Sequence, residues 1–124
     1  MMRNIVTLFL FNNSIQSVSA RGFFGLSELK TLDLSRNPIR IFPNGTFSYL
    51  LSLLLLNISN TDISSLGWNI FINNNNLTVL DLSYSRVGSI QYSMFRGLSL
   101  LEELYMSNVP TKVHSFSDLR VFNL

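Results

Sequence analysis

An interval of 24 residues recurs without drift through most of this chain of 124 residues. It separates five leucine and isoleucine residues: Ile5, Leu29, Leu53, Leu77 and Leu101. A fixed period of this size predicts a solenoid of stacked units, because one such unit is too short to bury its own apolar face. Any function then belongs to a surface of the stack and not to an enclosed pocket.

Each unit repeats the same apolar landmarks. The second unit reads Leu29, Leu32, Leu34, Asn37, Ile39, Phe42, Phe47 and Leu50. The stretch L-x-x-L-x-L alternates apolar and polar residues, which predicts a half-buried strand, and stacked units would pair these strands about 4.8 Å apart in a parallel sheet. One phenylalanine per unit predicts an aromatic spine on the far side of the core: Phe23, Phe47, Phe71 and Phe95.

The motif Leu29-x-x-Leu32-x-Leu34-x-x-Asn37-x-Ile39 and its shifted copies resemble the leucine-rich repeat family. The resemblance implies an α/β fold, a right-handed solenoid bent into a horseshoe arc. A short parallel β-sheet would line its concave face, and irregular or short helical return segments its convex face. The 24-residue length with a phenylalanine in the return segment is similar to the animal extracellular subclass, including the ectodomains of Toll-like receptors and of leucine-rich-repeat G-protein-coupled receptors.

The repeats predict a single domain over residues 1–124. Its expected units are 5–28, 29–52, 53–76, 77–100 and 101–118, with a partial unit 119–124. The last interval shortens to 18 residues, from Leu101 to Leu119. The cysteine-rich caps of the family are absent, so we expect an internal fragment or a truncated product. A complete small protein with tolerated edge strands remains the alternative, and the oligomeric state stays open.

Polar positions inside the repeat vary along the chain. The asparagine after the strand is expected to bond loop backbone groups. It changes along the units in the order Asn13, Asn37, Thr61, Ser85 and Val109. We therefore predict that the stack loosens toward its C-terminal end. The tract 73–76 is all asparagine and is expected to bulge from the third unit as a loop, and Trp68 is expected to pack in a return segment.

Residues 1–20 allow a second interpretation. Met1, Met2 and Arg3 precede an apolar run, and Val18-Ser19-Ala20 imitates a cleavage site, as in a short signal peptide. The register of the later repeats extends through the same residues, which favours a first structural unit. Both interpretations stay open at this point.

Composition argues against most other functions. The net charge of +2 is too small to favour nucleic-acid binding. There is no cysteine and one histidine, His114, so the sequence suggests no disulfide framework, thiolate metal site or cofactor. The apolar run 50–56 is far shorter than the roughly 20 residues of a membrane-spanning helix. Asp33 and Asp81 should lie two units apart, about 10 Å from each other, as solvated charges and not as a catalytic pair.

The strand face is the candidate binding surface. Residues predicted to point outward form rows that cross the units, and in the resembled family the concave face binds protein ligands. The candidate contact residues are Phe9, Phe11, Asp33, Leu55, Asn57, Asp81 and Tyr105. A third outward row is expected at Phe11, Ser35, Ser59, Ser83 and Ser107. Apolar side chains at wet positions are typical of interaction surfaces.

Four N-x-S/T sequons indicate passage through the secretory route if they carry glycans. They begin at Asn12, Asn44, Asn57 and Asn76. A glycan on Asn57 would obstruct the predicted binding face at its centre, so either Asn57 is unmodified or binding uses another side of the stack.

These observations favour a non-enzymatic protein-recognition module, part of the ligand-binding ectodomain of a leucine-rich-repeat receptor. Its partner would be a protein ligand or co-receptor, with no nucleic acid and no membrane span in this stretch. The expected location is the extracellular side of the plasma membrane or the secreted fraction. The alternative is a cytoplasmic adaptor or scaffold with the same repeats.

Overall fold

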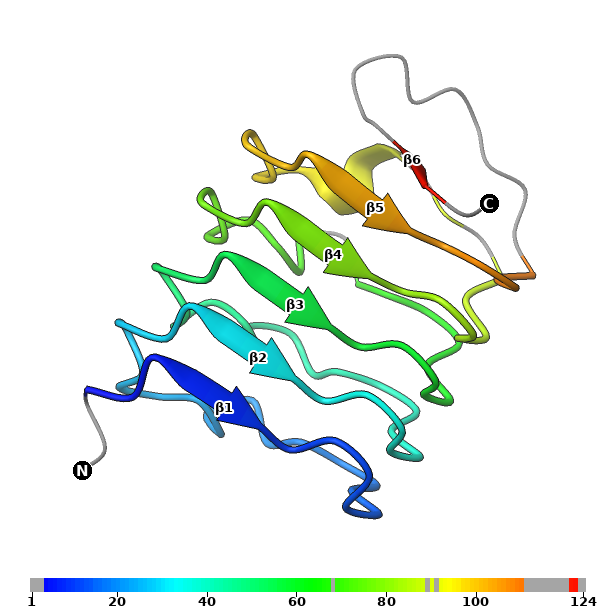
Figure 1. Cartoon of the computed structure of the whole chain (residues 1–124), viewed down its shortest axis with the longest axis horizontal. Helices are drawn as coiled ribbons and strands as arrows, with labels where there is room; N and C mark the ends of the chain where they lie inside the picture. The colour runs from blue at the N-terminus through cyan, green and yellow to red at the C-terminus, as the bar shows by residue number, and fades with distance from the viewer. Residues whose placement is uncertain (1–3, 68, 89, 91, 111–120, 123–124) are drawn as a thin grey trace.

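In the computed structural model, residues 4–67, 69–88, 90, 92–110 and 121–122 are described. Six short strands follow one another in a parallel sheet of order β1-β2-β3-β4-β5-β6 (Figure 1). Their bounds are β1 Thr7–Phe9, β2 Thr31–Asp33, β3 Leu55–Asn57, β4 Val79–Asp81, β5 Glu103–Tyr105 and β6 Val121–Phe122. A single 3-10 turn, η1, spans Tyr92–Phe95 in the fourth return segment. The predicted solenoid with a parallel sheet is confirmed.

The strand register follows the sequence period. Thr7 lies opposite Thr31, which lies opposite Leu55, and the same offset of 24 continues through Val79 to Glu103. The last pair departs from it: Leu104 lies opposite Val121, an offset of 121 − 104 = 17. The expected 18-residue interval would have placed Phe122 there, so that expectation was wrong by one residue. Leu119 itself lies outside the described residues.

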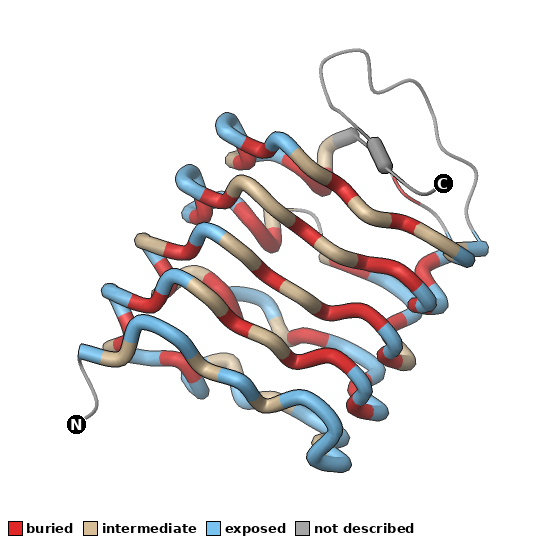
Figure 2. Tube along the Cα trace, in the orientation of Figure 1, coloured by how far each residue is buried: buried red, intermediate tan, exposed pale blue. Residues whose placement is uncertain are grey.

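The core lies between the sheet and the return segments (Figure 2). In the second to fourth units the landmark leucines and isoleucines are buried, and β2 to β5 each bury their central leucine. The first unit differs, because Ile5, Leu8 and Leu10 are only partly buried against the core. No earlier strand covers their outer side within the described part of the chain.

The aromatic spine is confirmed for three units. The Phe23 and Phe47 rings stack with centroids 6.4 Å apart, and Phe47 stacks on Phe71 at 5.9 Å. Phe47 and Phe71 are fully buried, and Phe95 is 6% exposed in the fourth unit. Because each buried ring is stabilised by about 1.5–3 kcal/mol, this column contributes strongly to holding the return segments against the sheet.

Asn37 joins the first unit to the second through five hydrogen bonds. Its Oδ1 accepts the backbone N–H groups of Asn13 and Ile15, both at 2.9 Å. Its Nδ2 donates to three backbone carbonyls, those of Leu10, Leu34 and Ser35. The predicted role of a buried asparagine amide is therefore confirmed at Asn37.

The equivalent positions in later units make fewer bonds. The Thr61 hydroxyl donates once, to the Ile58 carbonyl at 2.9 Å. The Ser85 hydroxyl is buried without a hydrogen-bond partner. The cross-linking by this position therefore decreases from the second unit to the fourth, which agrees with the predicted loosening; the loosening itself stays a prediction.

The asparagine tract 73–76 does not bulge from the third unit, and that expectation was wrong. Asn74 is 1% exposed and occupies the position where Leu50 and Leu98 stand in the neighbouring units. Three amides of the tract donate to carbonyls of the second unit: Asn73 to Ser48, Asn74 to Phe47 and Leu50, and Asn76 to Leu51, at 3.0–3.2 Å. The strict 24-residue period leaves no extra residue for a bulge, and the amides cross-link the turns instead.

Each unit turns after its strand through one residue in the left-handed region. These residues share a φ of 53–59° and recur every 24 positions: Asn12, Arg36, Asn60, Tyr84 and Asn108. The N–H of the first four donates to a serine carbonyl of the next unit at 2.7–3.1 Å. Asparagine tolerates this conformation well, whereas Arg36 and Tyr84 are strained there by their Cβ atoms.

Candidate interaction surface

The sheet register aligns the predicted contact residues in two rows across the strand face. One row is Phe9, Asp33, Asn57, Asp81 and Tyr105. The other is Thr7, Thr31, Leu55, Val79 and Glu103. From β2 to β5 every member of these rows is half-buried, and the two on β1 are exposed. The strand face therefore presents a continuous surface over five strands (Figure 1).

The third predicted row does not belong to this exposed face. Ser35, Ser59 and Ser83 are 6–7% exposed and lie buried just after their strands. Small serine side chains fit between neighbouring units there, and the Ser83 hydroxyl accepts the N–H of Ser107 at 3.1 Å. The expectation that these serines face solvent was wrong, whereas Phe11 in the same row is 49% exposed.

Phe9 and Phe11 form an exposed aromatic pair at the β1 end of the face. Their ring centroids lie 6.2 Å apart at 61°, an edge-on geometry. Phe9 is 60% exposed. Two neighbouring phenylalanine rings in water are costly, and burial of such rings is a typical source of binding energy in protein interfaces.

Asp33, Asn57 and Asp81 have a structural role that the row pattern did not reveal. The Oδ1 of each accepts the backbone N–H of the serine two residues later, at 2.9–3.0 Å. This local bond satisfies an N–H at the point where the strand ends. The signal was present in the sequence as the recurrent spacing Asp/Asn-x-Ser, and it means that these side chains support the backbone as well as facing the solvent.

Carboxylates gather toward the β4 and β5 end of the face. The Tyr105 hydroxyl donates to Oε2 of Glu103 at 3.2 Å. Partial burial, together with the negative charges of Glu103 and Asp81, raises the pKa of Tyr105 above its ordinary value of 10.0. The two rows contain three acidic residues and neither lysine nor arginine, although the whole chain is net positive.

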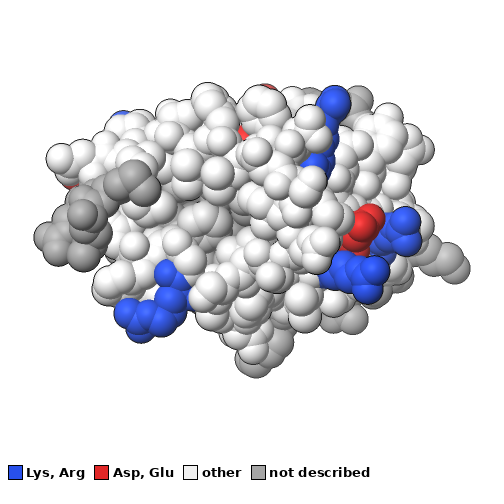
Figure 3. Space-filling view, turned by 90° about the horizontal axis from the view of Figure 1, so that it is seen from below, with Lys and Arg blue, Asp and Glu red and all other residues white. Residues whose placement is uncertain are grey.

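Charge elsewhere is sparse. The face seen in Figure 3 is mostly uncharged, with its basic and acidic groups in small separate clusters. Arg86 Nε lies 3.5 Å from Asp62 Oδ1, with both side chains largely open to solvent, so this pair adds little stability. Such a surface does not present the basic stripe that nucleic-acid binding requires.

The four sequons differ in accessibility. Asn12, Asn44 and Asn76 are exposed, whereas Asn57 is half-buried on β3. The Asn57 Oδ1 accepts both the N–H and the hydroxyl of Ser59, the latter at 2.7 Å. Asn57 is therefore the sequon most engaged in the fold, and whether any of the four carries a glycan stays a prediction.

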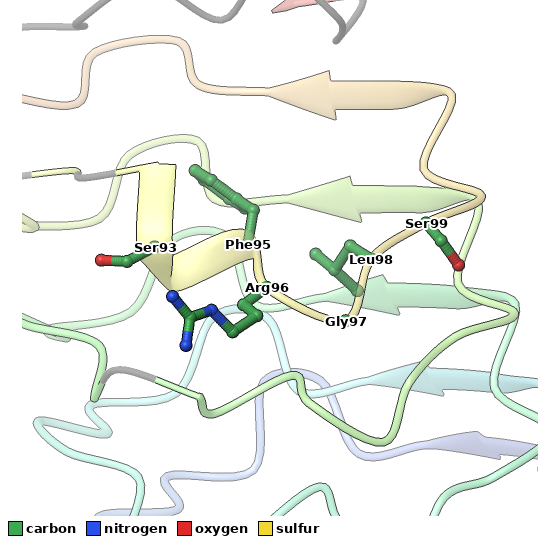
Figure 4. A pocket seen from close by; sticks show the side chains of 6 residues that line it. All are labelled: Ser93, Phe95, Arg96, Gly97, Leu98 and Ser99. Carbon is green, nitrogen blue, oxygen red and sulfur yellow. The ribbon is translucent and has the colours of Figure 1, made fainter.

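The hollows of the molecule carry no catalytic constellation. One of about 360 Å³ is lined by η1 and the turn after it, namely Ser93, Phe95, Arg96, Gly97, Leu98 and Ser99 (Figure 4). Arg96 is the one ionisable group among these six residues. Gly97, at φ +96°, lies so close to the third unit that a Cβ would come within 2.5 Å of the Phe71 carbonyl oxygen. The hollow is thus a packing feature between two return segments.

Other predicted positions give no site. Among the described residues, no group of three or more histidine, cysteine, aspartate or glutamate side chains is placed to hold a metal ion. Asp33 and Asp81 are separated by β3, so they share a row without forming a pair. Trp68 and His114 lie outside the described residues. No helix in the described part of the chain has the length and apolar character needed to cross a membrane.

Comparison with known proteins agrees with the fold. A family model described as leucine rich repeat matches residues 3–63 and 52–109. The chain is 33% identical over 130 residues to Toll-like receptor 3 of Bos taurus, which covers 94% of this chain and 14% of the receptor. It is 32% identical to Toll-like receptor 2 of Cricetulus griseus, over 96% of this chain and 14% of the receptor. It is also 32% identical to podocan of Mus musculus, over 86% of this chain and 18% of podocan.

Solved structures give the same result for the fold. The crystal structure of the leucine-rich repeat domain of APL1B superposes with a TM-score of 0.89 at 24% identity, covering 94% of this chain and 37% of that one. The APL1 leucine-rich repeat domain superposes equally well at 26% identity, over 93% of this chain and 30% of that one. The chain spans about one seventh of the length of the Toll-like receptors that it matches. With its 24-residue register, its parallel sheet and a family model that covers nearly its whole length, this chain belongs to the leucine-rich repeat family.

Proposed function

We propose that this chain is part of the ligand-binding ectodomain of a leucine-rich-repeat receptor and that its strand face binds a protein ligand. Leucine-rich repeat domains are typically non-enzymatic modules for protein interaction. The observation that carries the proposal is the exposed Phe9–Phe11 pair on a strand face that is continuous across five strands. Similarity to two Toll-like receptors supports the receptor assignment.

The two ends of the face suggest the chemistry of the ligand. The phenylalanine pair at β1 and the half-buried Leu55 and Val79 favour an apolar segment. Glu103 and the neighbouring carboxylates at β4 and β5 favour lysine or arginine on the partner, since complementary charge steers association and fixes orientation. We therefore expect a protein ligand with an apolar contact patch beside a basic one.

Binding is tested by displaying the chain on cells and screening it against a library of secreted proteins. For each protein captured, Phe9→Ser and Glu103→Lys should weaken binding, whereas Ile41→Ser, which alters an exposed side chain of a return segment, should not. Asp33 and Asp81 are unsuitable for this test because their side chains also support the backbone. Equal loss of binding in the Ile41 variant would argue against the strand face.

Location is tested separately, on the natural protein from its source tissue. Glycopeptide mapping should find sugar on the exposed sequons if the chain passed through the secretory route. A protein recovered from the cytosol with all four sequons unmodified would favour the alternative, a cytoplasmic adaptor or scaffold. A glycan on Asn57 would contradict ligand binding at the centre of the strand face.

A further inference from the structure

Three leucines are exposed on one flank of the solenoid, where the turns lead into the strands (Figure 2). Leu51 is 53% exposed, Leu54 40% and Leu100 54%. They are not landmarks of the repeat, whose own leucines at these turns, Leu53 and Leu101, are buried. Exposed apolar side chains that gather on one flank are a liability unless something covers them.

A glycosylation sequon lies among these leucines. The Asn76 Nδ2 donates to the backbone carbonyl of Leu51 at 3.2 Å. The hydroxyl of Thr78, the third residue of the sequon, donates to the carbonyl of Leu54 at 3.0 Å. Leu100 is the residue that follows Asn76 by one period of 24, so it occupies the same position in the next unit.

We propose that Asn76 carries an N-linked glycan whose first sugar rings lie over Leu51, Leu54 and Leu100. This inference rests on the proposed extracellular function. Pyranose rings expose C–H groups on their faces, and these groups pack on aliphatic side chains while the hydroxyls face water. A glycan at this position therefore converts an apolar flank into a hydrated one.

The attachment chemistry is compatible with the contacts of Asn76. The Asn76 Nδ2 bonds to the anomeric carbon of an oligosaccharide carried on a lipid diphosphate. The lipid diphosphate leaves, and the amide nitrogen loses one proton. The nitrogen keeps its second hydrogen, so it can still donate to the Leu51 carbonyl and hold the sugar beside the flank. The side chain is exposed, so the fold leaves room for the modification.

The test compares the full chain secreted from animal cells with two single variants, Asn76→Gln and Asn44→Gln. Asn44 is the matched control, because it is an exposed sequon in a return segment beside Ile70 and Ile72, away from the leucine flank. Hydroxyl-radical footprinting with mass spectrometry measures how far each leucine is open to water. In the wild-type chain Leu51 and Leu100 should be protected, in Asn76→Gln their oxidation should rise to the level of the chain made without glycans, and in Asn44→Gln it should not change.

A second variant, Thr78→Ala, removes the sequon but keeps the Asn76 amide, so it separates loss of the glycan from loss of the Asn76 hydrogen bond. It should give the same rise in oxidation as Asn76→Gln. Equal oxidation of the leucines with and without a mapped Asn76 glycan would overturn the inference, as would an unmodified Asn76 in a chain glycosylated at Asn12 or Asn44. Failure of the proposed function appears differently, as a natural protein that carries no glycan at any sequon.

Discussion

Replacing Asn37 with alanine should detach the first unit from the stack. The Asn37 side chain is 2% exposed and makes two bonds within its own unit and three to the first unit. The Leu34 carbonyl loses a buried partner, which costs about 1–3 kcal/mol, and the other four bonds are each worth about 0.5 kcal/mol because water or a second donor replaces them. The expected loss in free energy of unfolding is therefore about 3–5 kcal/mol.

The matched control is Asn13→Ala, the same residue type at the same position one unit earlier. The Asn13 side chain is exposed and donates one bond, to the Phe11 carbonyl at 3.2 Å. Its loss should change stability by less than about 0.5 kcal/mol. Urea denaturation measures both variants, and amide hydrogen exchange should show lost protection at Ile15, whose N–H is bonded by Asn37. Similar small losses in the two variants would refute the role assigned to Asn37.

Three further changes test the rest of the structure. Phe47→Ala should cost about 3–5 kcal/mol in thermal or urea unfolding because it empties the centre of the aromatic spine, whereas Ile41→Ala at an exposed site should cost little. Arg36→Asn should raise the free energy of unfolding by about 0.5–1 kcal/mol, since asparagine fits the left-handed φ of 57° better, and a loss would argue against backbone strain there. Tyr105 should form its phenolate, followed by ultraviolet absorbance, at higher pH in the folded than in the unfolded chain, and Glu103→Gln should lower that pKa. Because the folded-state pKa of Tyr105 is raised, its contribution to stability is present below about pH 10 and is lost as pH rises through the folded value.

Much of the fold could be predicted because the repeat encodes one set of contacts many times. A landmark leucine that recurs every 24 residues must occupy equivalent positions, so strand register, core and aromatic spine follow from counting. The prediction failed where the period itself ended, since the register after β5 is set by the packing of a shorter connection.

The side chains that decide local function were harder to predict. The tract 73–76 is polar, and polarity alone indicates a loop, but its amides find carbonyl partners in a neighbouring unit that is distant in sequence. The serine row alternates as an outward row should, yet the chain leaves the strand before reaching it and turns those hydroxyls between units. Asp33 and Asp81 were correctly placed on the strand face, but their bonds to the backbone were not expected.

The sequence by itself determined the solenoid, because a fixed period makes every unit bury the same residues against its neighbours. The tertiary structure alone decided which polar side chains cross-link the units, which rows face water and which leucines remain uncovered beside Asn76. The physical reason is that burial of apolar residues depends on a pattern along one chain. Hydrogen-bond partners and surface patches depend on residues from adjacent units that only stacking brings together.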